Sequence, residues 1–69
     1  MKFRRCVKRP IEVEFREVKP DEKGVETLEG YKPCSPEKHF IIRGVKGELY
    51  PIEKEIFYQT YDIVEEGAE

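Results

Sequence analysis

Within the segment Arg9–Val18, apolar and polar residues alternate from Ile11 to Arg16, and this alternation predicts a β-strand with one buried face. Val18 breaks the parity, so the strand either ends near Glu17 or carries a bulge there. Ile11, Val13 and Phe15 are the apolar positions of the predicted strand.

A turn follows this strand, because Pro20-Asp21 favours a reversal and Gly24 can adopt a positive φ. The chain then extends again over Val25–Glu29, and we expect these two strands to form a hairpin. Residues 30–38 contain two prolines, each of which removes an amide donor, and are therefore predicted to form a loop.

The segment His39–Arg43 is predicted to be a strand with apolar side chains on both faces, Phe40 and Ile42 on one and Ile41 on the other. Residues 44–47, Gly-Val-Lys-Gly, connect it as a hairpin to a partner strand over residues 48–52. Pro51 fits only at an edge or at the end of that strand, because it has no amide hydrogen to donate.

The C-terminal part of the chain is predicted to contain one helical turn and one last strand. The turn covers residues 53–57 and places Ile52 and Ile56 on one face. The strand covers residues 60–64, and residues 65–69 are expected to fray. We therefore predict a mainly β fold, an antiparallel meander of about five strands curled into a small barrel or roll. The alternative is an α+β sheet in which residues 52–59 lengthen into a covering helix.

Composition agrees with one small folded domain over residues 1–69. The 69-residue chain is 41% charged and 38% hydrophobic. Its apolar residues are mostly β-branched or aromatic, which suits strands and is unusual in disordered chains. No apolar run approaches the roughly 18 residues of a membrane helix, and the basic N-terminus lacks the apolar core of a secretory signal. We therefore expect a cytoplasmic protein.

Two cysteines, Cys6 and Cys34, are too few for a disulfide scaffold. Two reduced thiols are the simpler expectation, and a single bridge between them is the alternative. The chain has no Asn and one Gln, Gln59, and is rich in Lys and Glu, as in proteins from hot environments. Such an origin would favour the bridge, because intracellular disulfides occur in thermophiles.

The sequence offers little catalytic chemistry. Cys34 and His39 could form a nucleophile–base pair, but they lack an orienting third group and a chain this short rarely builds a cleft. Cys6 adds a third soft ligand without the spacing of a zinc site. The glycines of residues 44–47 lack the spacing of a phosphate loop and are explained by a hairpin. We predict that the protein is not an enzyme and holds no metal or cofactor.

Charge is distributed unevenly along the chain. Residues 1–9 carry five positive charges and no negative one, and residues 53–69 carry six acids against Lys54. A basic arm containing Phe3 could contact nucleic acid, with Tyr50 on a surface that continues it. The candidate contact residues for nucleic acid or another partner are Arg4, Arg5, Arg9, Arg43 and Lys46. The simpler expectation is that the arm lies beside the acidic C-terminal region, because the net charge is −2.

Residues 40–51, Phe-Ile-Ile-Arg-Gly-Val-Lys-Gly-Glu-Leu-Tyr-Pro, are followed by Ile56-Phe57 and Thr60-Tyr61. This run resembles a family of small uncharacterised proteins of tailed phages and prophages, with the signature Pro-Gly-Asp-Tyr-Ile-Ile-Arg-Gly-Val-Lys-Gly-Glu-Leu-Tyr-Pro and then Ile-Phe-x-x-Thr-Tyr. Phe3-Arg4-Arg5 and residues 8–14 are similar to the family's opening Tyr-Arg-Lys-Lys-Pro and first strand, and residues 25–30 to its middle strand.

One departure from that family lies before the third strand, where Glu37-Lys38-His39 replaces Pro-Gly-Asp. The turn there is expected to differ, and any role of the family's Asp does not carry over. The resemblance implies a fold and a genomic setting but no reaction. Arg43 and Glu48 are the charged residues shared with the family, and we expect them to form a cross-strand ion pair in the hairpin.

The residues and the resemblance together predict a non-enzymatic accessory protein of phage or mobile-element type that acts through protein contacts. A nucleic-acid-binding module that uses the basic arm is the alternative. The protein partner is not identified by the sequence, and a homodimer through an open sheet edge is left open.

Overall fold

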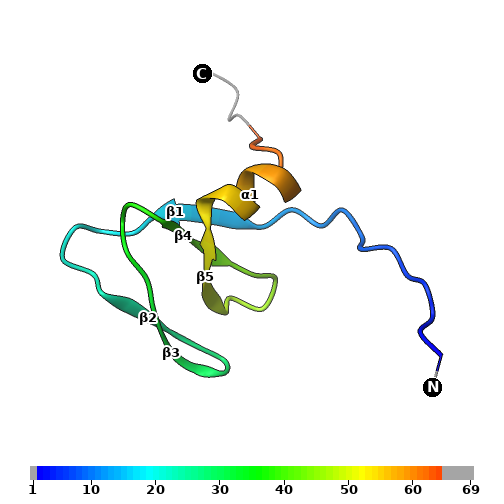
Figure 1. Ribbon diagram of the computed structural model, residues 1–69, viewed down its shortest axis with the longest axis horizontal. Coiled ribbons are helices and arrows are strands. Elements are labelled where there is room, and N and C mark those ends of the chain that lie inside the picture. Colours follow the sequence, from blue (N-terminus) through cyan, green and yellow to red (C-terminus); the bar gives the residue numbers. More distant parts are fainter. Residues whose placement is uncertain (1, 65–69) are drawn as a thin grey trace.

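The central element of the structure is strand β4 (His39–Arg43), which pairs antiparallel with β1 (Glu14–Glu17) on one side and with β5 (Leu49–Glu53) on the other. The computed structural model describes residues 2–64. A second sheet contains β2 (Gly24–Thr27) and β3 (Gly30–Pro33), and the helix α1 (Lys54–Thr60) follows β5 (Figure 1). The mainly β class is confirmed, with five antiparallel strands in two sheets and one short helix.

Strand β4 is buried on both faces, as its sequence predicts. Ile41 faces a cluster with the buried residues Val18, Val25 and Cys34, against which Leu49 packs. Phe40 and Ile42 face the opposite side, where they pack with Phe57 of α1. Because each face carries its own apolar cluster, a single short strand joins the two halves of the core.

Strand β1 does not pair with β2, so the predicted hairpin between the first two strands is wrong. Phe15 lies opposite Ile42 of β4 instead. Alternation along a strand specifies its buried face and carries no information about its partner. The apolar residues of β4 are stable only if both faces of the strand are buried. Strand β1 buries part of one face through Phe15, whose ring centroid lies 5.0 Å from that of Phe40.

Strands β2 and β3 form the local hairpin, so residues 30–33 are a strand and not part of a loop. The tight connection needs Gly30, whose φ is 106°. The Thr27 hydroxyl donates to the carbonyl oxygen of Gly30 at 2.7 Å and accepts from the Glu29 amide at 3.0 Å. Pro33 is tolerated because it lies at the end of the ladder, opposite Gly24.

The connection between β4 and β5 is the predicted hairpin at residues 44–47. The Gly44 amide donates to the Glu48 carbonyl at 2.8 Å, and the Gly47 amide donates to the Gly44 carbonyl at 2.9 Å. Gly47 adopts a φ of 82°. Pro51 lies in β5, at the edge of the three-stranded sheet, as expected for a residue without an amide hydrogen.

The expected ion pair between Arg43 and Glu48 does not form. Arg43 pairs with Glu14 at the start of β1, with Nη2 2.5 Å from Oε1. The Glu48 carboxylate accepts a hydrogen bond from the Lys46 amide at 2.9 Å and so closes the turn. Arg43 and Glu14 are opposite each other in the ladder, which explains the choice of partner.

The predicted helical turn is confirmed and continues to Thr60, so the strand expected over residues 60–64 is wrong. Phe57 is the buried residue of α1, and Ile56 is exposed. Phe57 fixes the helix by contacts with Phe15 at 4.6 Å and with Phe40 at 4.9 Å between ring centroids, and it stacks on Tyr61 at 5.1 Å. Residues 61–64 have no regular structure, and no closed barrel forms within residues 2–64. The fraying predicted for residues 65–69 lies outside the described residues.

Residues 2–12 form an exposed arm without regular structure, which leaves the sheet before β1 (Figure 1). The predicted strand therefore begins at Glu14 and not at Arg9, because β4 ends at Arg43, the partner of Glu14. The arm explains a radius of gyration of 14.1 Å, against about 11 Å for a compact chain of this length.

No helix within residues 2–64 has the length and apolar character needed to cross a membrane.

Candidate functional site

The outer edge of β1 is the open edge of the three-stranded sheet. Its four residues are exposed, and no strand of residues 2–64 pairs with its outer side. The other edge, β5, is in contact with β2 and β3 and contains Pro51. Because unpaired amide and carbonyl groups of an edge strand can pair with an additional strand, β1 is the part of the sheet suited to binding.

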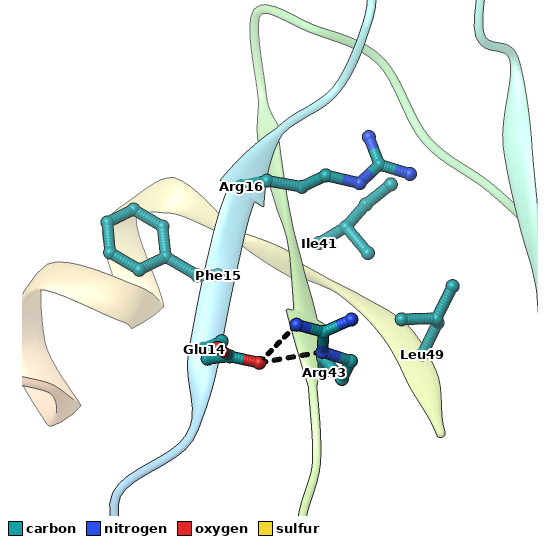
Figure 2. Close-up of a pocket in the computed structure, with 6 residues that line it drawn as sticks. All are labelled: Glu14, Phe15, Arg16, Ile41, Arg43 and Leu49. Atoms are coloured by element: carbon teal, nitrogen blue, oxygen red, sulfur yellow. Dashed lines mark hydrogen bonds and ion pairs between the residues drawn. The ribbon is translucent and has the colours of Figure 1, made fainter. Parts of the chain in front are cut away.

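A shallow hollow of about 140 Å³ lies beside β1, on the side of the sheet that carries Ile41. In Figure 2, Arg16, Ile41 and Leu49 extend to the same side of the sheet, whereas Phe15 projects to the opposite side toward the helix. The hollow therefore has an apolar floor with guanidinium groups at its borders. Its lining consists of Glu14, Phe15, Arg16, Ile41, Arg43 and Leu49.

Both guanidinium groups of this hollow are paired with carboxylates. Arg43 pairs with Glu14, and Arg16 donates two hydrogen bonds of 2.9 Å to Glu22 in the loop after β1. The bonds from Arg16, together with one from the Lys19 amide at 3.0 Å, lower the pKa of Glu22 to about 2. A two-pronged contact of this kind fixes the direction of the Arg16 side chain, so the border of the hollow is preorganised.

A larger groove of about 630 Å³ lies on the other side of the sheet, between the end of the arm and the segment after α1. Its walls are residues 9–15 and 60–64, and its floor includes Ile42 and Phe57. Next to it, burial and a hydrogen bond with Tyr61 raise the pKa of Tyr50 to about 12. The groove is thus mostly apolar at its base, with charged residues in its walls.

The sequence-predicted contact residues lie in two places. Arg4 and Arg5 are exposed in the arm, and Arg9 is in the wall of the groove. Arg43 and Lys46 lie together at the turn end of β4, and Arg43 is engaged by Glu14. No described contact joins the arm to the hairpin, so these five residues do not form one continuous site.

The Cys34–His39 pair does not have the geometry of a nucleophile and its base. The His39 Nδ1 accepts a hydrogen bond from the Ser35 amide at 3.1 Å, while the His39 amide donates to the Ser35 carbonyl at 3.0 Å. Burial raises the pKa of the Cys34 thiol, which disfavours the thiolate. His39 therefore closes the turn over residues 35–39.

Cys6 and Cys34 are both free thiols, Cys6 exposed in the arm and Cys34 buried beneath β2. Within residues 2–64, no group of three His, Cys, Asp or Glu side chains is arranged to hold a metal ion.

Neither the open edge of β1 nor the groove could be identified from the residues alone. Both depend on which strands pair, and the sequence assigned β1 to the wrong neighbour. A signal was present, however, in the alternation that continues through residues 9–13 beyond the first paired residue. Comparison of the chain with protein families, curated proteins and solved structures gave no match.

Proposed function

We propose that this chain is a non-enzymatic accessory protein of the phage or mobile-element type, which acts by binding another protein along β1. The observation that carries the proposal is the open outer edge of β1, with four exposed residues, in a sheet whose other edge is covered. An extended segment of a partner can add to such an edge through main-chain hydrogen bonds.

The surroundings of β1 suit a strand placed there, because alternate side chains of an added strand point to opposite faces of the sheet. On one face they would meet the hollow over Ile41 and Leu49. On the other they would meet Phe15, which is partly exposed beside the groove. Main-chain pairing would supply affinity, and the two hollows would select the partner's side chains.

The absence of enzymatic activity is part of the proposal. It is supported by the turn-closing role of His39 and by the raised pKa of Cys34, both of which argue against thiolate chemistry. The phage or mobile-element setting rests on the resemblance of residues 40–51 described above. The same residues have structural tasks here, in β4, the hairpin turn and β5.

A photo-cross-linking experiment tests the β1 edge. A benzophenone amino acid replaces Glu17 in β1 or, as the control, Lys32 in β3, and the proteins are irradiated in the cells that encode them. Glu17 has only an exposed ion pair with Lys54, whose loss costs little stability. We expect one reproducible partner from position 17 and none from position 32.

The purified partner must then bind the unmodified protein and slow hydrogen exchange of the β1 amides, with those of β2 unchanged. Equal cross-linking from both positions, or a partner that leaves β1 exchange unaffected, would contradict binding along this edge.

Nucleic-acid binding through the arm is a second candidate, favoured by its exposed cations. None of Lys2, Arg4, Arg5, Lys8 and Arg9 pairs with a carboxylate among residues 2–64. Binding by such an arm would weaken steeply with salt, because each phosphate contact releases a counterion.

The test compares DNA and RNA binding of the wild type with that of a variant carrying Arg4→Glu, Arg5→Glu and Arg9→Glu. Weak binding that falls with salt and disappears in the variant supports this second candidate. Binding that survives the three changes, or no binding at low salt, excludes the arm as a nucleic-acid contact.

A further inference from the structure

Two segments with the sequence pattern of strands face each other across the groove without a strand between them. Residues 9–13 alternate apolar and polar, as do residues 60–63, yet neither segment belongs to a sheet. Ile11 lines one wall and Ile63 the other, and both remain exposed. Disagreement of this kind between sequence pattern and structure is expected at functional sites.

The first part of the exposed arm, residues 2–8, has the properties of a segment that could lie between these two walls. Phe3 and Val7 are 102% and 91% exposed, although both side chains are apolar. In an extended chain they lie on the same face, because side chains alternate with a period of two. Residues 2–8 would then span about 23 Å. The arm therefore offers an apolar face with cationic residues around it.

Charge also matches the arm to the groove. The groove walls include the carboxylates of Glu12 and Asp62 and the guanidinium of Arg9, whereas the Glu14 carboxylate pairs with Arg43. Residues 2–8 contribute Lys2, Arg4, Arg5 and Lys8, and no acidic residue. An arm lying in the groove would place its cations near these carboxylates and its apolar face against the exposed side chains of Ile11, Phe15 and Ile63.

We propose that residues 2–8 of one copy of this chain bind in the groove of a second copy, and that the exchange is reciprocal in a symmetric dimer. The chain's own groove is a poor target for its arm, because residues 9–13 already form one wall of it. The Ile11 amide donates to the Arg9 carbonyl at 2.8 Å, a three-residue bend around Pro10. That bend leaves the arm directed away from the domain (Figure 1). A second copy accepts it without a further reversal.

The mass of the full-length protein in solution, measured by sedimentation equilibrium, tests the dimer. We expect a concentration-dependent dimer of the 8.2 kDa chain. Phe3→Asp should weaken dimerisation at least tenfold. Val45→Asp is the matched control, because it also replaces an exposed apolar side chain by a carboxylate but lies in the β4–β5 turn, and it should leave dimerisation unchanged. A monomer at all concentrations, or equal weakening by both variants, overturns the proposal.

Disulfide trapping distinguishes exchange between copies from folding back within one. Wild-type protein, whose Cys6 lies in the arm, is mixed with a tagged variant carrying Cys6→Ser and Asp62→Cys, and the mixture is oxidised with diamide. Exchange predicts rapid cross-linking between the two kinds of chain. A control variant with Cys6→Ser and Glu26→Cys, on β2, should cross-link slowly.

The single variant Asp62→Cys carries Cys6 and the introduced cysteine in the same chain, so it shows whether the arm reaches the groove of its own chain. Formation of a disulfide within one chain, in place of the cross-linked dimer, overturns the exchange, as does equal cross-linking at the two introduced positions. Glu14 and Phe15 of β1 also line the groove, but the disulfides report only the position of the arm, so photo-cross-linking from position 17 is judged separately.

Discussion

Arg16 and Glu22 form a two-pronged ion pair, in which Nη1 lies 2.9 Å from Oε1 and Nη2 lies 2.9 Å from Oε2. The contact joins the open strand β1 to the loop that leads away from it. Arg16 also donates to the Glu17 carbonyl at 3.0 Å, so one side chain connects the strand and the loop. The pair thereby holds the border of the hollow beside β1 in a fixed shape.

Glu22 is expected to make folding stability depend on acid pH. Its pKa is lowered to about 2 in the folded chain, first by the hydrogen bonds from Arg16 and then by that from the Lys19 amide. A group whose pKa is depressed by folding contributes stability above its unfolded pKa and loses it as pH falls toward the folded value. Urea denaturation at several pH values should therefore show stability declining from about pH 4.5 toward pH 2.

The variant Glu22→Gln should be less stable at pH 7 and should have a shallower decline in this range. Glu26→Gln is the matched control, because Glu26 lies exposed on β2 and has no ion pair among the described residues. An identical pH profile for wild type and Glu22→Gln would show that the Arg16 contact does not persist in solution.

The two thiols should differ sharply in reactivity. Cys6 is exposed, whereas Cys34 is buried and its thiol pKa is raised by that burial. Titration with a chromogenic disulfide reagent at pH 8 should modify Cys6 rapidly and Cys34 only after denaturation. Cys6→Ser should abolish the fast phase. A fast phase that persists in this variant would contradict the burial of Cys34.

Phe57→Ala should remove most of the folded population. Phe57 is 2% exposed and touches Phe15, Phe40 and Tyr61. Such a change costs about 3–5 kcal/mol, which approaches the roughly 3–10 kcal/mol expected for a domain of this length. Circular dichroism and urea denaturation measure the loss, and Ile56→Ala, at the exposed neighbouring position, should change stability by about 0.5 kcal/mol or less.

Tyr50 is expected to make the fold sensitive to alkali. Burial, followed by the hydrogen bond with Tyr61, raises its pKa to about 12, so the folded chain keeps a proton that the unfolded chain loses near pH 10. Stability should therefore fall as pH rises from about 10 to 12. In an ultraviolet titration, Tyr50 should ionise late, and Tyr61→Phe should bring its ionisation to lower pH.

The β4–β5 hairpin is the part of the fold that the sequence predicts best. Phe40, Ile41 and Ile42 indicate a strand with two apolar faces, and the glycines at positions 44 and 47 mark the turn. These signals are local, because they depend on residues that are neighbours in the chain. The structure confirms both the opposite burial of Ile41 and the edge position of Pro51.

The pairing of β1 with β4 could not be predicted in the same way. Phe15 meets Ile42 because the two apolar faces of β4 need cover, and that demand comes from tertiary packing. The strand predicted over residues 60–64 is wrong for a similar reason. The alternation of these residues fits a strand, but the packing of Phe57 holds a helix that continues to Thr60. The candidate site follows the same division, because exposed arginines are visible in the sequence, whereas the open edge and the groove arise only once the strands are placed.

The pairing of β1 with β4 also has a consequence for the order of folding. Both other strand pairings join neighbours along the chain, whereas β1 reaches β4 across the whole β2–β3 hairpin. Closing the longer loop loses more chain entropy, so we expect the two hairpins to form first and β1 to join last. On the ribosome, β1 is made before the strand it pairs with. The apolar side chain of Phe15 in β1 therefore lacks its packing partners until β4 has emerged, and it is a part of the nascent chain that a chaperone would meet.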